Sequence, residues 1–465
     1  MKQIKNRDYA STSHSGKVML LTCTILAFAV MNGTMFNVAI PDISESFKLT
    51  PAQVSWVITS FTTVFAIGTL IYGKLADFFP IRRLYTIGLC LFALGSFIGF
   101  LSPNYETLIA ARILQAMGAA AVPPLSFLVP IRFFQKKKGK MFGYLASTIA
   151  FSSGIGPLVG GMIGGVLDWR YIFLISVASA FAIPLFRKWF PDEAKQKGKI
   201  DFIGAALVGA AVTSLLFIIT TVNWLSVLFF MLFFILLIWR INAISYPFIE
   251  PKMLRIRKYT VTLVTSYLGN TIVFGLIFLL PLMLRELYEL TMLEIGLILF
   301  PGAIASGLIS KWIGKVIAVR GGKPIIQFGL LLISSGAFFI STFAGTNTLL
   351  IALGLFIAYL GFPLIQSGTA DLISSNISEK ENGVGMGLFN LLNFLAGAFS
   401  SALFGKLLER GNSSLQLNPF SLAGEHLIYS NIYLIFTVLG FFSFFFFSFS
   451  YRQDKFSSLS KLKRS

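Results

Sequence analysis

One arginine lies inside an otherwise apolar run of the sequence. Arg112 follows Glu106 by six residues, and its nearest neighbours are alanine, isoleucine and leucine. A guanidinium ion is costly in such surroundings, so it needs a hydrogen-bonding partner or a water-filled cavity. Two interpretations follow: a structural arginine bonded to backbone carbonyl groups, or a charged group that takes part in moving a substrate or a proton.

Uncharged polar side chains recur in apolar runs of the same kind. They either line a polar cavity or hydrogen bond between neighbouring helices, and the sequence leaves both roles open. The candidates for a substrate cavity are Asn32, Asn37, Gln115, Asn270, Gln366, Asn390 and Asn393. Asp371, near the end of its run, is the one acid of the last six runs that could titrate inside the protein, although its place near the end of the run favours the membrane interface. An interfacial position is its alternative.

A short charged loop joins two apolar runs at residues 73–83. Gly73 permits close approach of two helices, Asp77 can cap a helix or pair with a base, and Arg82 and Arg83 follow. Such a loop can act as a charge lock that holds two helices together in one state and releases them in another. The alternative is a solvated turn whose basic residues face an anionic membrane surface.

The patterns typical of enzymes and of nucleotide-driven pumps are absent from the sequence. It has no phosphate-binding loop, no zinc-ligand spacing and no nucleophile–base constellation. His14 and His426 lie outside the apolar runs, while Cys23 and Cys90 lie inside them. We therefore expect no catalytic residue, no metal and no cofactor. Work done by this protein must draw on a gradient.

The elements that position these residues are long apolar segments. Of 465 residues, 55% are hydrophobic and 12% are charged, about half the charged share of a soluble protein. The runs are too long and continuous for barrel strands, so the fold class is an all-α polytopic membrane protein. Fourteen spans are predicted, near residues 18–40, 53–73, 84–102, 106–131, 141–166, 171–187, 203–223, 225–240, 260–284, 292–313, 324–343, 348–372, 384–407 and 428–450.

The basic residues support this arrangement of spans. With a cytoplasmic N-terminus, 32 of the 38 Lys and Arg fall in cytoplasmic segments, five fall outside and Arg112 stays in the membrane. The positive-inside rule describes such a bias, and one missed span would invert it. The net charge of +19 therefore reports topology, with both termini cytoplasmic, and does not indicate a nucleic-acid partner.

Polar stretches divide the spans into groups of six, two and six. The predicted units are a cytoplasmic tail (1–17), a six-helix bundle (18–190), a linker with two extra spans (191–258), a second six-helix bundle (259–450) and a basic cytoplasmic tail (451–465). Loop 314–322 looks like a weakened copy of loop 73–83, which fits two homologous halves. We expect a monomer embedded in the lipid bilayer.

Several motifs, each on the expected span, resemble those of the major facilitator superfamily and of its fourteen-span drug:proton antiporters. Loop 73–83, residues 32–41 and the stretch from Arg112 to Gly118 resemble three of them. Span 5 resembles the antiporter motif through Gly143, Gly156, Pro157, Gly160 and Gly161. Within that group, segments 72–75, 300–302 and 383–390 are most similar to Gram-positive class K and L tetracycline efflux proteins.

This resemblance implies the major facilitator fold and a bacterial plasma-membrane exporter. The expected function is export of an amphipathic, drug-like small molecule by proton antiport with alternating access, giving multidrug or tetracycline-type resistance. Loop 73–83 would be the conformational lock, and Arg112, Asp77 and Asp371 the proton-path candidates. The alternatives are an exporter of an endogenous metabolite or self-made antibiotic, and a non-transporting membrane sensor or assembly subunit.

The chain departs from the tetracycline exporters at four acidic positions. It carries Gly33, Ser153, Val319 and Gly397 where those proteins place carboxylates in or near the membrane. An opposing carboxylate is the main means of stabilising a cation at low dielectric. We therefore predict that a lipophilic dication is a poor substrate and that a neutral, zwitterionic or anionic amphiphile is a better one.

Overall fold

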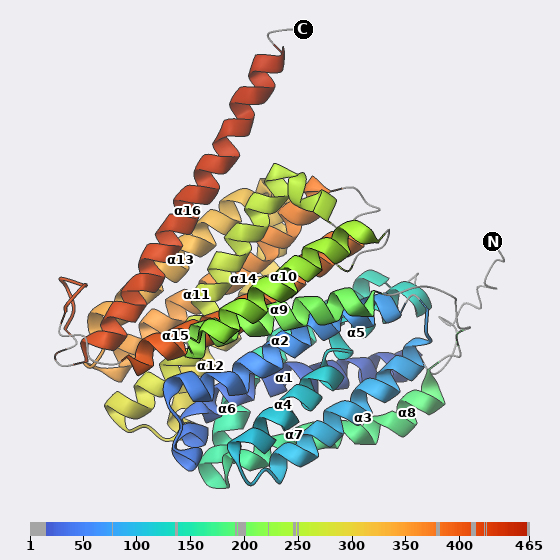
Figure 1. Ribbon diagram of the computed structural model, residues 1–465, viewed down its shortest axis with the longest axis horizontal. Helices are drawn as coiled ribbons and strands as arrows, with labels where there is room; N and C mark the ends of the chain where they lie inside the picture. The colour runs from blue at the N-terminus through green and yellow to red at the C-terminus, as the bar shows by residue number, and fades with distance from the viewer. Residues whose placement is uncertain are drawn as a thin grey trace.

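The computed structural model describes residues 15–76, 78–134, 138–190, 193, 201–221, 223–244, 248, 251–377, 382–410, 415–422, 424 and 426–462. Every regular element in these ranges is a helix (Figure 1). The first half contains α1 (Ser15–Phe47), α2 (Pro51–Leu75), α3 (Ile81–Phe100), α4 (Tyr105–Ala119), α5 (Val122–Phe133), α6 (Lys138–Val166), η3 (Trp169–Tyr171), α7 (Ile172–Val177), η4 (Ala178–Phe181) and α8 (Ala182–Trp189). It is followed by α9 (Phe202–Thr221), α10 (Trp224–Ala243), η5 (Pro251–Arg255), α11 (Arg257–Tyr288), α12 (Met292–Arg320), α13 (Gly322–Phe343), α14 (Thr348–Asn376), α15 (Asn382–Glu409) and α16 (Leu427–Leu462).

The described residues contain fourteen helical segments long and apolar enough to cross a membrane, which confirms the predicted number. Two of these segments are interrupted helices. The span Tyr105–Pro130 joins α4 to α5, and α5 carries prolines at its start, where the missing amide donors cost nothing. The span Trp169–Trp189 passes through η3, α7, η4 and α8. At the other end of the chain, α16 continues past the predicted span and through most of the predicted tail.

Polar caps begin several helices at one face of the molecule. Thr50 and Thr291 begin α2 and α12, and each forms a capping box with the third residue of its helix, Gln53 or Glu294. Such side chains satisfy the amide groups that the first helical turn leaves without partners. Single side-chain caps begin α4, α10 and α14 at Asn104, Asn223 and Asn347.

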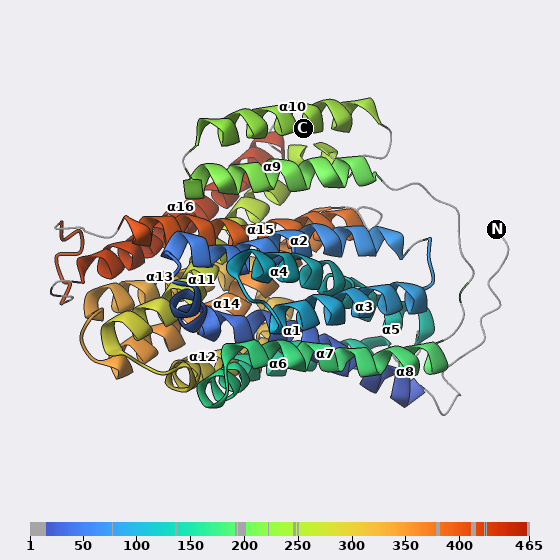
Figure 2. The ribbon, with the colours of Figure 1, turned by 60° about the horizontal axis from the view of Figure 1, so that its bottom comes forward.

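The helices form two six-span bundles and a separate hairpin. Helices α1–α8 make the first bundle and α11–α16 the second, while α9 and α10 lie as an additional layer against them (Figure 2). Val208 of α9 packs near Ile67 of α2, and Leu216 of α9 packs on α15. Leu237 is the one buried residue of α10. The hairpin therefore spans the seam between the bundles and presents α10 to lipid.

The two bundles meet at one end and spread apart at the other. In Figure 1 they lie together at the lower left and separate toward the upper right. Contacts between the bundles join α6 to α12, α2 to α15 and α1 to α11. We call the joined end, which carries the turns at residues 48–50, 167–168 and 289–291, the closed end.

Candidate functional site

Arg112 lies in the interior of the first bundle with 1% of its surface exposed. Its Nε donates to the Val57 carbonyl oxygen at 3.1 Å. Its Nη1 donates to Gln115 Oε1 at 2.6 Å and to Asn32 Oδ1 at 3.3 Å. Helices α1, α2 and α4 thus meet at one guanidinium group, and three predicted residues, Asn32, Arg112 and Gln115, come together.

Aromatic rings and hydroxyl groups complete this cluster. The guanidinium carbon lies 4.1 Å from the ring centroids of both Phe36 and Phe61, a distance at which the ring faces attract a cation. Gln115 donates to Ser96 and Asn32 donates to Ser176, each at 2.8 Å. Among the described residues, Arg112 has only uncharged partners. The first bundle therefore holds a positive charge that no described carboxylate neutralises.

The second bundle holds a closed ring of three amide side chains. Asn270 Nδ2 donates to Asn393 Oδ1 at 3.0 Å, Asn393 Nδ2 to Gln366 Oε1 at 3.2 Å, and Gln366 Nε2 to Asn270 Oδ1 at 2.9 Å. The three residues come from α11, α14 and α15, near the middle of each helix. Ser266 donates to Asn393 Oδ1 at 2.9 Å. The ring is uncharged, so the two bundles differ in the charge that they bury.

Two predicted cavity residues join neither cluster. Asn37 is half-buried on α1, and Asn390 is exposed on α15. The polar residues that sequence analysis grouped together thus separate into two clusters and two isolated side chains.

The loop between α2 and α3 is held by residues from distant parts of the chain. Asp77 itself lies outside the described residues. On either side of it, Arg132 Nη2 donates to the Ala76 carbonyl oxygen at 2.5 Å, and the Ile81 amide donates to Glu193 Oε2 at 2.7 Å. Arg132 and Glu193 also form an ion pair at 3.0 Å. Charged groups therefore contact the described residues on both sides of Asp77, and sequence analysis missed Glu193 among them.

The remaining loop residues take separate positions. A Cβ atom added at Gly73 would have no neighbour within 4 Å among the described residues. Arg82 Nη1 donates to the Arg187 carbonyl oxygen at 3.3 Å. Arg83 is exposed. The close helix approach that the sequence predicted at Gly73 is therefore not made by the structure.

Asp371 has a role in the second bundle that parallels that of Glu193 in the first. Its Oδ2 accepts a hydrogen bond from the Gly322 amide at 3.0 Å, at the first residue of α13. In the same way, Glu193 Oε2 accepts a hydrogen bond from the amide of Ile81, the first residue of α3. A carboxylate is favourable at a helix N-terminus because it meets free amide groups and the positive end of the helix dipole.

The antiporter-like glycines of α6 permit contacts on two sides. A Cβ atom on Gly160 would lie 2.9 Å from the Met35 carbonyl oxygen of α1, and Gly156 faces Thr34 of the same helix. A Cβ atom on Gly161 would lie 2.7 Å from the Met292 carbonyl oxygen of α12. The Pro157 carbonyl oxygen packs against Gly296 of α12, and Gly143 lies nearer the start of α6. Small residues here let α6 pack within its bundle and across the seam.

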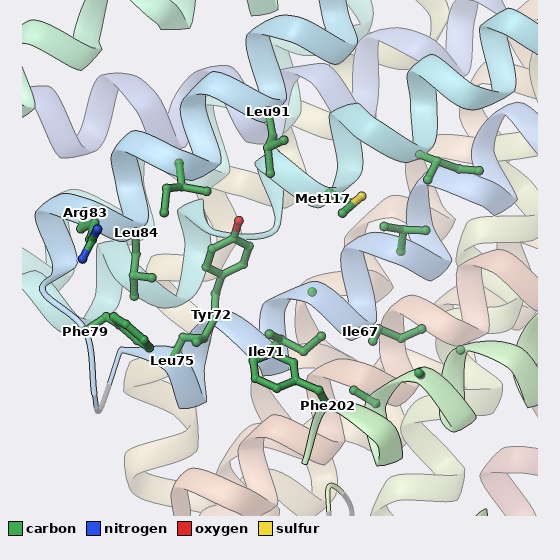
Figure 3. Close-up of a pocket in the computed structure, with 17 residues that line it drawn as sticks. Ile67, Ile71, Tyr72, Leu75, Phe79, Arg83, Leu84, Leu91, Met117 and Phe202 are labelled. Carbon is green, nitrogen blue, oxygen red and sulfur yellow. The ribbon is translucent and has the colours of Figure 1, made fainter. Parts of the chain in front are cut away.

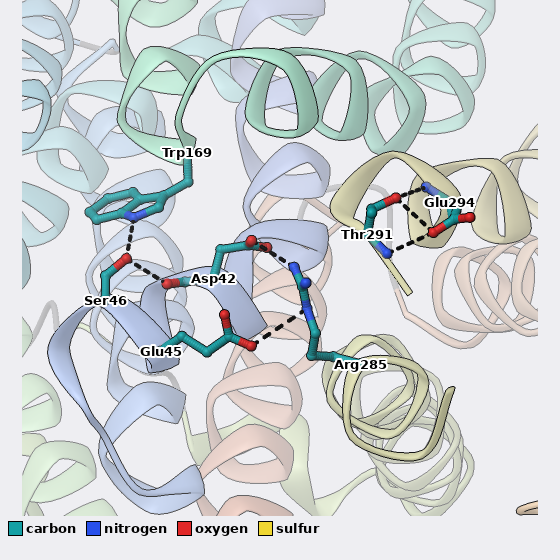
Figure 4. Close-up of polar contacts among 7 residues, drawn as sticks. All are labelled: Asp42, Glu45, Ser46, Trp169, Arg285, Thr291 and Glu294. Atoms are coloured by element: carbon teal, nitrogen blue, oxygen red, sulfur yellow. Dashed lines mark hydrogen bonds and ion pairs between the residues drawn. The ribbon is translucent and has the colours of Figure 1, made fainter. Parts of the chain in front are cut away.

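An ion pair that sequence analysis missed joins the bundles at the closed end (Figure 4). Arg285 Nη2 of α11 donates to Asp42 Oδ1 of α1 at 2.6 Å, and Arg285 Nε lies 3.8 Å from Glu45 Oε1. Nearby, Trp169 Nε1 donates to Ser46 Oγ at 3.0 Å. The sequence does carry a signal for this ion pair. Arg285 is one of the few basic residues on the extracellular side, and Asp42 and Glu45 follow the first predicted span.

The sequence matches a known protein family over most of its length. A model of the family described as Major Facilitator Superfamily matches residues 22–401. The chain belongs to the major facilitator superfamily. Among superfamily relatives, the riboflavin transporter RibZ of Clostridioides difficile is 27% identical over 398 residues, covering 83% of this chain and 87% of the relative. The lincomycin resistance protein LmrB of Listeria innocua is 24% identical over 410 residues, covering 85% and 87%.

Solved structures of superfamily transporters share the fold. A mutant form of the nucleoside transporter NupG has a TM-score of 0.68 at 14% identity and covers 93% of this chain and 99% of its own. A bacterial homologue of the human lysosomal transporter Spinster, in an inward-facing unoccupied conformation, has a TM-score of 0.66 at 13% identity, with coverage of 96% and 99%. The family match and the relatives in sequence identify this chain as a multi-pass transporter of the bacterial cell membrane for small molecules, and not an enzyme.

Proposed function

We propose that this protein is a secondary active exporter of an amphipathic, drug-like compound, driven by proton antiport. The observation that carries the proposal is the arrangement of two bundles joined at one end and separated at the other, each with its own buried polar cluster. Rocking such bundles about a fixed midplane region is the alternating-access motion of this kind of transporter. The relationship to LmrB supports a drug-like substrate.

The direction of transport is inferred from the basic residues. The positive-inside bias places both termini and loop 73–83 in the cytoplasm. The bundles spread apart toward this same face (Figure 1). In this state the protein would accept its substrate from the cytoplasm and release it after the Asp42–Arg285 end opens. It would act as a monomer and without nucleic acid.

The charge of the substrate is inferred from Arg112. A fixed cation that is paired only with dipoles attracts anionic groups and repels cationic ones, and low dielectric strengthens both effects. Neutral, zwitterionic or anionic amphiphiles are therefore the proposed substrate class. This substrate class includes tetracycline-type compounds and neutral ring systems with polar edges.

The proton path is proposed to include Asp77, Asp371 and Arg112. Arg112 keeps its charge throughout, so its contribution is to favour a carboxylate or an anionic substrate nearby. Asp371 accepts a backbone amide at a helix start, where loss of its charge would weaken the start of α13. Asp42 joins this set, because its protonation would release Arg285 and loosen the closed end.

A second candidate function is export or uptake of an endogenous metabolite. The relationship to the riboflavin transporter RibZ favours it. An uncharged polar ring in one bundle and a dipole-paired cation in the other suit a neutral heterocycle with hydrogen-bonding edges as well as they suit a drug.

Accumulation of labelled compounds in whole cells separates these functions. We expect an efflux-deficient host expressing the protein to accumulate less of an exported drug, with the difference lost on adding an uncoupler. A panel of minimum inhibitory concentrations in the same host would identify the drug class. Increased cellular uptake of riboflavin-like heterocycles with no change in any inhibitory concentration would favour the second function instead. Unchanged accumulation throughout would contradict both.

A further inference from the structure

A groove of about 780 Å³ lies on the flank of the first bundle, between α2, α3, α4 and α9 (Figure 3). Its walls are apolar and include Ile67 and Ile71 of α2, Leu91 of α3, Met117 of α4 and Phe202 of α9. Ile87, Met117 and Phe202 of its lining are 46%, 45% and 55% exposed, so the groove is open at its side. The residues of the two buried polar clusters do not line this groove.

The groove runs from one membrane face to the middle of the membrane. On α2 it extends from Leu75, at the end of the helix, back to Val64, and on α3 from Arg83 to Leu91. Eleven residues of helix rise about 16 Å. The hydrocarbon core of a bilayer is about 30 Å thick, so the groove matches the depth of one leaflet.

One end of the groove carries a positive charge. Arg83 is the only charged residue among the seventeen that line the described groove, and it lies where α3 begins (Figure 3). The Arg83 backbone amide donates to the Pro80 carbonyl oxygen, whereas its guanidinium makes no hydrogen bond or ion pair with another described residue. An exposed guanidinium with five donors at the membrane surface suits a phosphate group, which it can bind in a bidentate manner.

We propose that this groove binds an acyl chain of an anionic phospholipid, with the lipid phosphate on Arg83. The charge at one end, the apolar walls and the depth of one leaflet together match a lipid of the adjoining leaflet. The basic residues place that leaflet on the cytoplasmic side, which carries the anionic lipids. Because an acyl chain already lies in hydrocarbon, its transfer into the groove gains little. Selectivity therefore rests on Arg83 and on the fit.

The bound lipid connects the hairpin to the first bundle. Beside Phe202, the α9 wall is made by the small residues Ala205, Ala206 and Gly209, which leave the space that the acyl chain would fill. Since α9 also packs on α15 through Leu216, a lipid in the groove supports the helix that spans the seam between the bundles.

Native mass spectrometry of the full-length protein tests the proposal, with phosphatidylglycerol and phosphatidylcholine as the added lipids. We expect one phosphatidylglycerol to be retained at least fivefold more often than phosphatidylcholine. Arg83→Gln should abolish this preference and Arg83→Lys should keep part of it. Arg187→Gln is the matched control, because Arg187 is an exposed basic residue at the same face and does not line the groove.

A second pair of variants tests the groove walls. Ala206 is exposed in the groove, so Ala206→Leu should fill it without disturbing packing and reduce lipid retention several-fold. Ala243→Leu, on the exposed end of α10, should leave retention unchanged. Equal retention of the two lipids by the wild type, or full retention by both Arg83→Gln and Ala206→Leu, would overturn the proposal. So would displacement of the lipid by an exported compound, which would assign the groove to the substrate.

Discussion

Arg285 and Asp42 join the two bundles at their closed end, with 2.6 Å between Nη2 and Oδ1. Their side chains are 23% and 26% exposed, so water screens the pair only partly. Asp42 Oδ2 is buried and has no hydrogen-bond partner among the described residues. Opening this end would expose both groups to water. The pair thus belongs to one conformational state and biases the equilibrium toward it.

Asp42→Asn is expected to shift the protein toward opening of this end. A partly exposed ion pair contributes up to about 1 kcal/mol, or about fivefold in the equilibrium. The measurement is the rate at which an impermeant maleimide labels a cysteine at Ser401, which is buried at the α2–α15 seam, in a chain lacking Cys23 and Cys90. Glu409→Gln is the control, since Glu409 pairs with Lys406 within α15. Equal labelling of the two variants would show that the pair does not hold the end closed.

Arg112→Ala is expected to abolish coupled transport, and Arg112→Lys to restore it only in part. Arg112 bonds three partners through a planar fork between two rings, and an ammonium group offers neither the fork nor the stacking. The measurement is the transport rate of the purified variants, compared at equal amounts of protein. Normal pumping by both variants would make Arg112 a purely structural residue.

Asn393→Ala is expected to destabilise the second bundle by about 1–3 kcal/mol, because it removes one hydrogen bond from the buried Asn270 and one from the half-buried Gln366. Asn390→Ala on the same helix should have almost no effect, since Asn390 is exposed. Thermal unfolding in detergent compares the two. A similar loss from both would mean that the amide ring adds no specific stability.

Asp77→Asn is expected to abolish transport and leave the protein in the membrane. The loop on both sides of Asp77 is fixed by Arg132 and Glu193, and the resemblance to the superfamily motif assigns the acid to the conformational lock. Glu193→Gln should weaken the same lock and should lower the transport rate less than Asp77→Asn does. Efflux near the wild-type level by a normally expressed Asp77→Asn protein would contradict this role.

The sequence predicted the spans well because hydropathy and basic residues act locally. Each apolar run identifies a helix by itself, and the side of each loop follows from its own charges. Arg112 and Gln115 are neighbours on one helix face, so their contact could also be predicted from the sequence. The partners Asn32 and Ser176 come from other helices, whose rotation hydropathy does not define.

The same limit explains what the sequence missed. Asp42 stands just beyond the first apolar run, so it appeared to be a loop residue, although α1 continues to Phe47. Its partner Arg285 is 243 positions away. Asn390 and Asn393 looked equivalent in sequence, yet one is exposed and the other belongs to the amide ring. Helix packing, which is a property of the whole fold, decides such cases.

Gradient-driven transport in proteoliposomes tests the central claim most directly, with a zwitterionic amphiphile and a bis-biguanide dication compared in the same preparation. The account predicts proton-gradient-dependent movement of the amphiphile, its loss with an uncoupler, and much slower movement of the dication. Gln115→Glu should narrow the difference in transport rate between the amphiphile and the dication, because it places a carboxylate beside Arg112. In the wild type, Gln115 Oε1 lies 2.6 Å from Arg112 Nη1. Transport of the dication by the wild type as fast as the amphiphile, or no gradient-dependent transport of either, would contradict the account.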